Sequence, residues 1–146
     1  MTQTNEAKEA NAGSPVTFVK DRIENPAEPR HYMKLKPTRG PVTLKLGERV
    51  LAHSEGALRL LEVGYDLYDP VLYVPWADVS ASLARIEAKT THCPLKGDAS
   101  YWALDGAAHS EAIAWSYETP FDFAAVLAGH VAFDPSKITV IEGPSA

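Results

Sequence analysis

The chain has 146 residues, which suits one domain on the usual scale of roughly 100–200 residues per domain. Its hydrophobic fraction of 45% and charged fraction of 23% are those of a soluble globular protein, and they exclude a wholly disordered chain and a fibrous repeat. The net charge is −5, whereas a protein that binds double-stranded nucleic acid usually has a positively charged surface. No apolar run reaches the roughly 18 residues of a membrane-spanning helix, so we expect no membrane partner.

The charge is unevenly distributed along the chain. Residues 1–41 carry seven basic against five acidic groups, or +2, whereas residues 42–146 carry seven against fourteen, or −7. The first segment is also broken by prolines and has few periodic apolar positions, so it buries too little surface to offset the entropy of ordering. We therefore expect residues 1–30 to be a flexible N-terminal tail and residues 31–146 to form a single domain. The sequence shows no apolar secretory signal, so we expect a cytoplasmic location.

From Pro41 onward, short β-branched and aromatic runs alternate with turn residues, a pattern typical of an all-β domain. In chain order, we expect strands at 42–46, 49–54, 57–63, 71–75, 82–88, 99–104, 109–117, 130–133 and 137–142, with a bend or single helical turn at 75–78. One short helix near 120–128 is predicted, because Thr119 can cap it, Pro120 suits its first position and Gly129 can end it. The predicted fold is mainly β: a small rolled sheet, barrel or sandwich of about eight or nine short strands with one short helix.

The densest group of reactive side chains lies at residues 90–102, with the sequence TTHCPLKGDASYW. Pro94 and Gly97 predict a turn that places Lys96 at the entrance of a strand, where backbone amides could help to hold an anion. Arg59 is a second candidate anchor for this anion. The alternative is that these cations are solvated and pair with nearby carboxylates, such as Asp98, in surface pairs that contribute about 0–1 kcal/mol.

Aromatic residues follow on the next two predicted strands, which a turn at 105–106 would place side by side. Side chains alternate along a strand, so Tyr101 and Trp102 point to opposite faces, whereas Trp115 and Tyr117 share one face. One indole then packs in the core while other rings line a pocket or an outer face, depending on a register that the sequence leaves open. The candidate ligand-binding residues are therefore Lys96, Tyr101, Trp115, Tyr117 and Arg59.

Cys93 is the single cysteine of the chain and a candidate catalytic nucleophile. A thiolate needs a lowered pKa, which Lys96 or a distant histidine such as His53 or His130 could supply. The alternative is a small, buried and unreactive thiol between strands. A lone cysteine excludes an internal disulfide, and the five histidines lack the spacing of metal ligands. We therefore predict no metal site and no cofactor.

Several motifs, taken in order, resemble a known family. They are AHS at 52–54, PWADV at 75–79, THCPLKGDASYW at 91–102, AWSY at 114–117 and VAF at 131–133. Together they resemble the bacterial family called domain of unknown function 427, over roughly residues 31–142. The most specific stretch contains Cys93, Pro94, Gly97 and Trp102. The resemblance implies a small, mainly β domain, and it implies no residue roles.

This family is sometimes called nucleotidyltransferase-like. Nucleotidyl transfer usually needs carboxylates that hold Mg²⁺, and the sequence has neither a close Asp-x-Asp pair nor a phosphate-binding glycine loop. Our leading hypothesis is a soluble domain that binds a small anionic or nucleotide-like molecule at a pocket of lysine and aromatic side chains. One alternative is a protein-interaction or homodimerisation module that uses the same rings. Another is an enzyme, either nucleotidyltransferase-like or dependent on Cys93.

Overall fold

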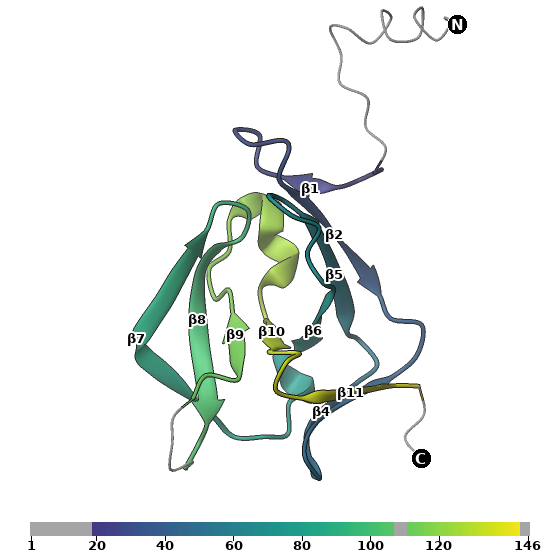
Figure 1. Ribbon diagram of the computed structural model, residues 1–146, viewed down its shortest axis with the longest axis vertical. Coiled ribbons are helices and arrows are strands. Elements are labelled where there is room, and N and C mark those ends of the chain that lie inside the picture. Colours follow the sequence, from purple (N-terminus) through teal and green to yellow (C-terminus); the bar gives the residue numbers. More distant parts are fainter. Residues whose placement is uncertain (1–18, 107–110, 144–146) are drawn as a thin grey trace, which may run out of the picture.

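The computed structural model describes residues 19–106 and 111–143, and these residues are mostly in β-strands (Figure 1). The strands are β1 (Ile23–Glu24), β2 (Tyr32–Pro37), β3 (Val42–Leu46), β4 (Arg49–Ser54), β5 (Leu58–Val63), β6 (Val71–Pro75), β7 (Leu83–Cys93), β8 (Gly97–Leu104), β9 (Ala114–Ser116), β10 (His130–Phe133) and β11 (Thr139–Glu142). Two short 3₁₀ helices, η1 (Trp76–Asp78) and η2 (Asp122–Leu127), lie between strands. The predicted mainly β fold class is confirmed.

Eight strands form one curled sheet with the order β1-β2-β5-β6-β10-β9-β8-β7, in which every neighbouring pair is antiparallel. In Figure 1, β7 and β8 lie on one side and β2 and β5 on the other, with β9, β10 and β6 between them. β1 and β7 remain the two edges, so the described part of the sheet is rolled but does not close into a barrel. A second sheet, β11-β3-β4, lies across one end of the rolled sheet.

The rolled sheet buries apolar side chains on both of its faces. On one face, Val74 and Val131 pack with Val42 and Leu44 of the second sheet to form the first core. On the other face, a second core lies under η2, and its members are Met33, Leu60, Tyr73, Leu95, Ala99, Tyr117, Ala124, Leu127 and Ala132. This second face is the inner face of the rolled sheet, and both aliphatic and aromatic side chains line it.

Four predicted strands have the bounds that the sequence pattern indicated, namely β3, β4, β6 and β10. The strand expected at 82–88 continues to Cys93, and the next strand already begins at Gly97, so the two form a long hairpin. The strand expected at 109–117 is described at Ala114–Ser116, while its positions 109–110 lie outside the described residues. The total exceeds the eight or nine expected strands, because β1 and β2 arise from the segment before residue 41.

The described structure starts upstream of the domain boundary that we expected at residue 31. Ile23 of β1 pairs with the fully buried Met33 of β2. The Arg22 guanidinium lies 4.5 Å from the centroid of the Tyr32 ring, and the side-chain amide of Asn25 donates to the Pro94 carbonyl at 3.0 Å. These long-range contacts supply packing that the local pattern does not show. Positions 1–18 of the expected tail lie outside the described residues.

The predicted helix at 120–128 is shorter than expected and is a 3₁₀ segment, η2. Thr119 does not cap it, since the N-cap position is Phe121 and no side chain makes a capping bond there. The Phe121 amide instead donates to the Lys96 carbonyl at 3.0 Å, which binds this segment to the turn before β8. Non-helical angles at Ala124 then interrupt the segment. Among the described residues, no helix has the length and apolar character needed to cross a membrane.

Candidate functional site

The turn between β7 and β8 presents Lys96 to the interior of the rolled sheet. The Lys96 amide donates to the Cys93 carbonyl at 3.2 Å, which closes a β-turn that includes Pro94. Gly97 has a φ of +117°, where a residue with a Cβ atom is strained, and an added Cβ would lie 3.4 Å from the Pro120 Cα atom. The turn that the sequence predicts is therefore present, and its shape depends on Gly97.

The Lys96 side chain is buried, with 6% of the residue exposed. Its Nζ atom lies 2.6 Å from Oε1 of Glu62 on β5. A buried ammonium needs a partner of opposite charge, and Glu62 supplies it from 34 residues away. Asp98, the neighbour that we considered as a surface partner, instead pairs with exposed His92 at 2.8 Å. The alternative of a solvated Lys96 is therefore wrong.

Cys93 and His31 complete a cluster around this ion pair. The Lys96 Nζ atom lies 3.8 Å from Cys93 Sγ, and Nε2 of His31 lies 2.6 Å from Oε2 of Glu62. Within the described residues, His31, Glu62 and Cys93 offer three ligand atoms within 4.8 Å of one another, a combination of donors that zinc accepts. Here the Lys96 ammonium already pairs with Glu62, so the carboxylate has a positive partner without a metal ion. The cluster also holds a single carboxylate, which is not the oxygen-rich site that Mg²⁺ prefers.

The aromatic side chains are placed by the register of four neighbouring strands. Tyr101 of β8 pairs with Trp115 of β9, which pairs with Ala132 of β10, which in turn pairs with Tyr73 of β6. Directly paired residues share one face of a sheet, so the three rings form a row on the inner face. Ala132 is small and fully buried, and beside it the Trp115 indole donates to the Tyr73 hydroxyl at 3.2 Å.

The same register places Trp102 on the opposite face, where it pairs with Ala114. Its ring packs edge-on against Trp76, with centroids 4.9 Å apart, as part of the first core. Its indole donates to the Ser116 hydroxyl at 3.0 Å. Trp102 is therefore the core indole, and Trp115 is the indole on the inner face.

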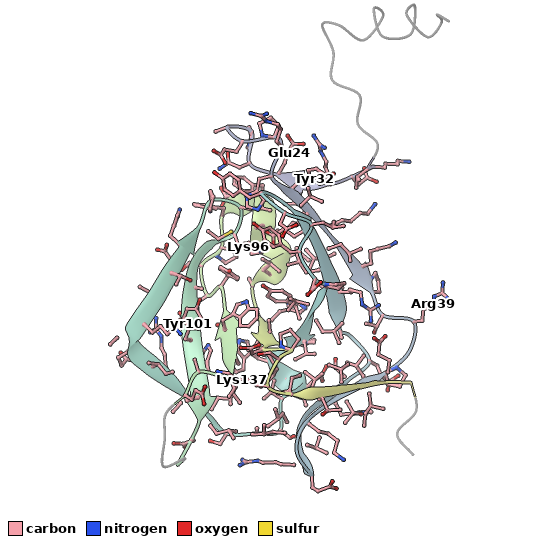
Figure 2. All side chains as sticks on the ribbon, in the orientation of Figure 1. Glu24, Tyr32, Arg39, Lys96, Tyr101 and Lys137 are labelled. Carbon is pink, nitrogen blue, oxygen red and sulfur yellow. The ribbon has the colours of Figure 1, made fainter. Side chains whose placement is uncertain are left out.

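A cavity of about 320 Å³, hereafter the central cavity, lies within the rolled sheet. Figure 2 shows Lys96, Tyr101 and Lys137 arranged about the middle of the molecule. Its polar and aromatic lining residues are Glu62, Tyr73, Lys89, Lys96, Tyr101, Trp115, Tyr117, Asp134 and Lys137. Four predicted ligand-binding residues, namely Lys96, Tyr101, Trp115 and Tyr117, are thus brought together around one cavity.

Arg59 is not brought together with them. It precedes Leu60 on β5 and so points to the face opposite to that of Leu60, which lines the central cavity. Its guanidinium lies 2.5 Å from the Glu142 carboxylate on β11, and it lines a second hollow of about 290 Å³. Its partner on the second sheet holds it away from Lys96.

Sequence reasoning missed five polar residues of the central cavity, namely Glu62, Tyr73, Lys89, Asp134 and Lys137. The sequence contained a signal for Glu62, because alternate residues of a strand share one face and Glu62 follows Leu58 and Leu60 at this spacing. The lining holds three lysines against two carboxylates, a balance of +1 inside a segment that is otherwise acidic.

The charged and hydroxyl groups of the cavity have different environments. The Lys89 ammonium lies 4.5 Å from the centroid of the Tyr101 ring, and Lys137 donates to the Ala112 carbonyl at 2.7 Å. Burial alone would raise the pKa of Asp134, but hydrogen bonds from Ser136 and the charge of Lys137 outweigh burial and lower that pKa. Near Lys96, burial raises the pKa of the Tyr73 and Tyr117 hydroxyls far above the usual value.

The most exposed large apolar side chains are not those of the predicted aromatic site. The two most exposed, Tyr65 and Leu67, lie in the segment between β5 and β6, and Tyr65 is fully exposed. The rings that the homodimerisation hypothesis invoked, such as Tyr101 and Trp115, line the central cavity instead. Homodimerisation stays a prediction, which light scattering over a range of protein concentrations would test.

A family comparison covers most of this structure. Residues 34–143 match the model of a family described as "Domain of unknown function (DUF427)". The matched span contains strands β3 to β11 and all the lining residues of the central cavity named above. A comparison with curated proteins found no match. Because the family model matches well over half of the 146 residues, the chain belongs to the DUF427 family of domains of unknown function.

Proposed function

We propose that the central cavity binds a small anionic or nucleotide-like molecule. The observation that carries this proposal is the meeting of buried Lys96 with the rings of Tyr101, Trp115 and Tyr117 around one cavity. Ligand sites are concave, mostly apolar, and fitted with a few polar groups that fix orientation. The central cavity has the aromatic walls of such a site and a larger set of polar groups, namely three lysines and two carboxylates.

Charge and size both support a small anion. The lining carries one more lysine than carboxylate, and although Lys137 also pairs with Glu111 at 3.0 Å, this cluster of lysines stands out in a segment, residues 42–146, that carries −7 as a whole. The cavity volume of about 320 Å³ lies near the lower end of the range of roughly 300–1,000 Å³ that ligand pockets occupy. We therefore expect a ligand no larger than a mononucleotide.

Thermal-shift measurements on the full chain would test the proposal. The panel is adenosine monophosphate, glucose 6-phosphate and benzoate, which share a negative charge and differ in size and planarity. A ligand of the folded state raises the melting temperature by mass action. We expect at least one compound to stabilise the wild type and to give a much smaller shift with Lys96→Ala.

Each ligand-induced shift is compared with the melting temperature of the same variant without ligand, because Lys96→Ala also weakens the fold. Lys45→Ala is the matched control, since Lys45 lies on β3 of the second sheet and pairs with exposed Glu48. Equal shifts in the wild type, Lys96→Ala and Lys45→Ala would rule out binding at this cavity.

A second candidate function is catalysis that depends on Cys93. The supporting observation is the Lys96 ammonium 3.8 Å from Cys93 Sγ, with the paired His31 and Glu62 side chains beside it. A nearby positive charge stabilises a thiolate, the form of cysteine that acts as a nucleophile. Because the chain has a single cysteine, alkylation by iodoacetamide reports on this thiol alone.

Under this candidate, we expect alkylation of the folded protein at neutral pH, and slower alkylation in Lys96→Met because the stabilising charge is lost. Free cysteine serves as the reference for the rate. A folded protein that reacts no faster than free cysteine, with no dependence on Lys96, would remove Cys93 as a nucleophile.

A further inference from the structure

We propose that the end of the central cavity formed by Tyr73, Lys96 and Tyr117, hereafter the donor end, binds the carboxylate of a small monocarboxylate with a planar apolar body. This inference rests on the proposed function and specifies the ligand chemistry of the same cavity.

The donor end holds buried hydrogen-bond donors that lack acceptors within the described chain. Tyr117 is 7% exposed, and its hydroxyl makes no hydrogen bond with any residue in 19–106 or 111–143. Tyr73 is 1% exposed, and its hydroxyl accepts from the Trp115 indole while its own proton finds no acceptor in those same ranges. Buried polar groups are almost always hydrogen-bonded, so such donors point to an acceptor supplied by a bound molecule.

Lys96 adds a third donor close by. Its Nζ atom lies 5.9 Å from the centroid of the Tyr117 ring and bonds Oε1 of Glu62, and its remaining strong donor capacity has no oxygen acceptor among the described residues. Burial keeps the pKa of both tyrosines raised, so their hydroxyls stay protonated and donate at neutral pH. The donor end therefore offers two neutral hydroxyl donors and one ammonium.

This set of donors matches an oxyanion. An ionised carboxylate only accepts hydrogen bonds, and its two oxygens have about four lone-pair sites, enough for all three donors. Hydrogen bonds to a charged acceptor are also roughly twice as strong as those between neutral groups. A neutral hydroxyl or amide ligand would bring donors of its own into a place that already has an excess of them.

The charge count favours a single negative charge. Lys89, Lys96 and Lys137 outnumber Glu62 and Asp134 by one among the lining residues, but Lys137 also pairs with Glu111 at 3.0 Å. Glu62 compensates Lys96 at 2.6 Å, so the positive charge left for a ligand is that of Lys89, which lies over the Tyr101 ring and has no carboxylate within 4 Å among the described residues. A dianionic phosphate would keep one uncompensated charge in a buried site, and such a charge is costly.

The body of the ligand is set by the aromatic row. Trp115 and Tyr101 are paired across β9 and β8 and line the cavity on the same face as Tyr73. Aromatic faces pack well against flat apolar groups in offset or edge-to-face arrangements. A carboxylate bound at the donor end would place its attached ring against these walls. Benzoate is the simplest probe with both features.

The test follows the indole Nε1–H resonances of the full-length protein by NMR during titration with benzoate. Trp115 donates to the Tyr73 hydroxyl at the cavity, whereas Trp102 donates to Ser116 on the opposite face and serves as the internal control. We expect a saturable shift of the Trp115 resonance and a constant Trp102 resonance. Loss of one hydrogen bond in Tyr117→Phe should weaken benzoate binding about 10- to 100-fold.

Matched variants and ligands separate the contributions. Tyr65→Phe, which removes a fully exposed hydroxyl, should leave benzoate binding unchanged. Tyr73→Phe should weaken binding as Tyr117→Phe does, and it serves as the second variant if Tyr117→Phe does not fold. Benzamide, a neutral analogue of the same shape, should bind more weakly than benzoate and lose less on Tyr117→Phe. Phenyl phosphate should bind more weakly than benzoate.

Different failures have different meanings. Tighter binding of phenyl phosphate, or benzoate binding that is unaffected in both tyrosine variants, would overturn the carboxylate site while leaving the proposed function intact. The same holds if benzoate does not bind but adenosine monophosphate or glucose 6-phosphate stabilises the protein in a Lys96-dependent way. Absence of binding by every compound in both assays would overturn the proposed function as well.

Discussion

Replacement of Lys96 by Met tests whether the ion pair with Glu62 is a buried structural link. The side chains of Lys96 and Glu62 are 7% and 12% exposed, and their charged atoms are 2.6 Å apart. Met keeps most of the apolar length of Lys but leaves the Glu62 carboxylate with His31 as its close partner. Removal of one partner from a buried pair typically costs about 3–5 kcal/mol, because the remaining charge stays buried.

The assay is urea unfolding followed by tryptophan fluorescence. We expect Lys96→Met to lower the free energy of unfolding by about 3–5 kcal/mol, and to lower the melting temperature by about 10–15 °C at roughly 3 °C per kcal/mol for a chain of this size. The double variant Lys96→Met/Glu62→Gln should recover part of this loss, because it removes the uncompensated charge. Lys45→Met is the control, and its partner Glu48 is fully exposed, so no measurable change is expected.

A loss below about 1 kcal/mol in Lys96→Met would refute this reasoning, since that is the value of an exposed pair. It would mean that water reaches the donor end and screens the charges. The inference of a buried, donor-rich end of the cavity would then lose its physical basis.

Three further predictions concern the turn, the tyrosines and the aromatic row. Gly97→Ala, at a φ of +117°, should cost about 1–3 kcal/mol in urea unfolding, and more than Gly47→Ala at +60°; equal costs would contradict the special role of Gly97. Because burial raises the pKa of Tyr73 and Tyr117, these groups keep protons that the unfolded chain releases above pH about 10. Stability should therefore fall by up to about 1.4 kcal/mol per pH unit for each tyrosine as the pH rises beyond that value. Absorbance titration should show two of the six tyrosines ionising only on unfolding, and reversible ionisation of all six in the folded protein would contradict this. Ala132→Leu should overpack the row at a cost of about 1–3 kcal/mol and shift the Trp115 indole resonance; unchanged stability would show that the row has spare room.

Local sequence patterns account for many of the individual elements. The bounds of β3, β4, β6 and β10 follow from alternating apolar residues and the turns between them, which are short-range properties of the chain. The turn at Pro94 and Gly97 is likewise local, because proline restricts φ and glycine accepts a positive φ. The outlying cases, such as β1 and the 3₁₀ form of η2, depend on distant partners.

The way in which these elements pack together depends on contacts between distant parts of the chain. Alternation shows that Tyr101 and Trp102 point to opposite faces, but the inner face is assigned by the register that pairs Tyr101 with Trp115 and Trp115 with Ala132. Register is set by packing across strands far apart in the sequence, so a local pattern does not contain it. The same pairing brings Tyr73 into the row, although no motif pointed to it.

Lys96 shows the division most clearly. The sequence, with its net charge of −5, predicted that Lys96 lies at a turn and close to aromatic residues. Its partner was not, because Glu62 lies 34 residues away and reaches Lys96 only when the sheet rolls. Arg59 was predicted as a possible second anchor, but the alternation of side chains along β5 turns it to the other face, where it pairs with Glu142 of the second sheet. Turns depend on residues that are neighbours in the sequence. Ion pairs and cavities depend on contacts between residues that are far apart in the sequence.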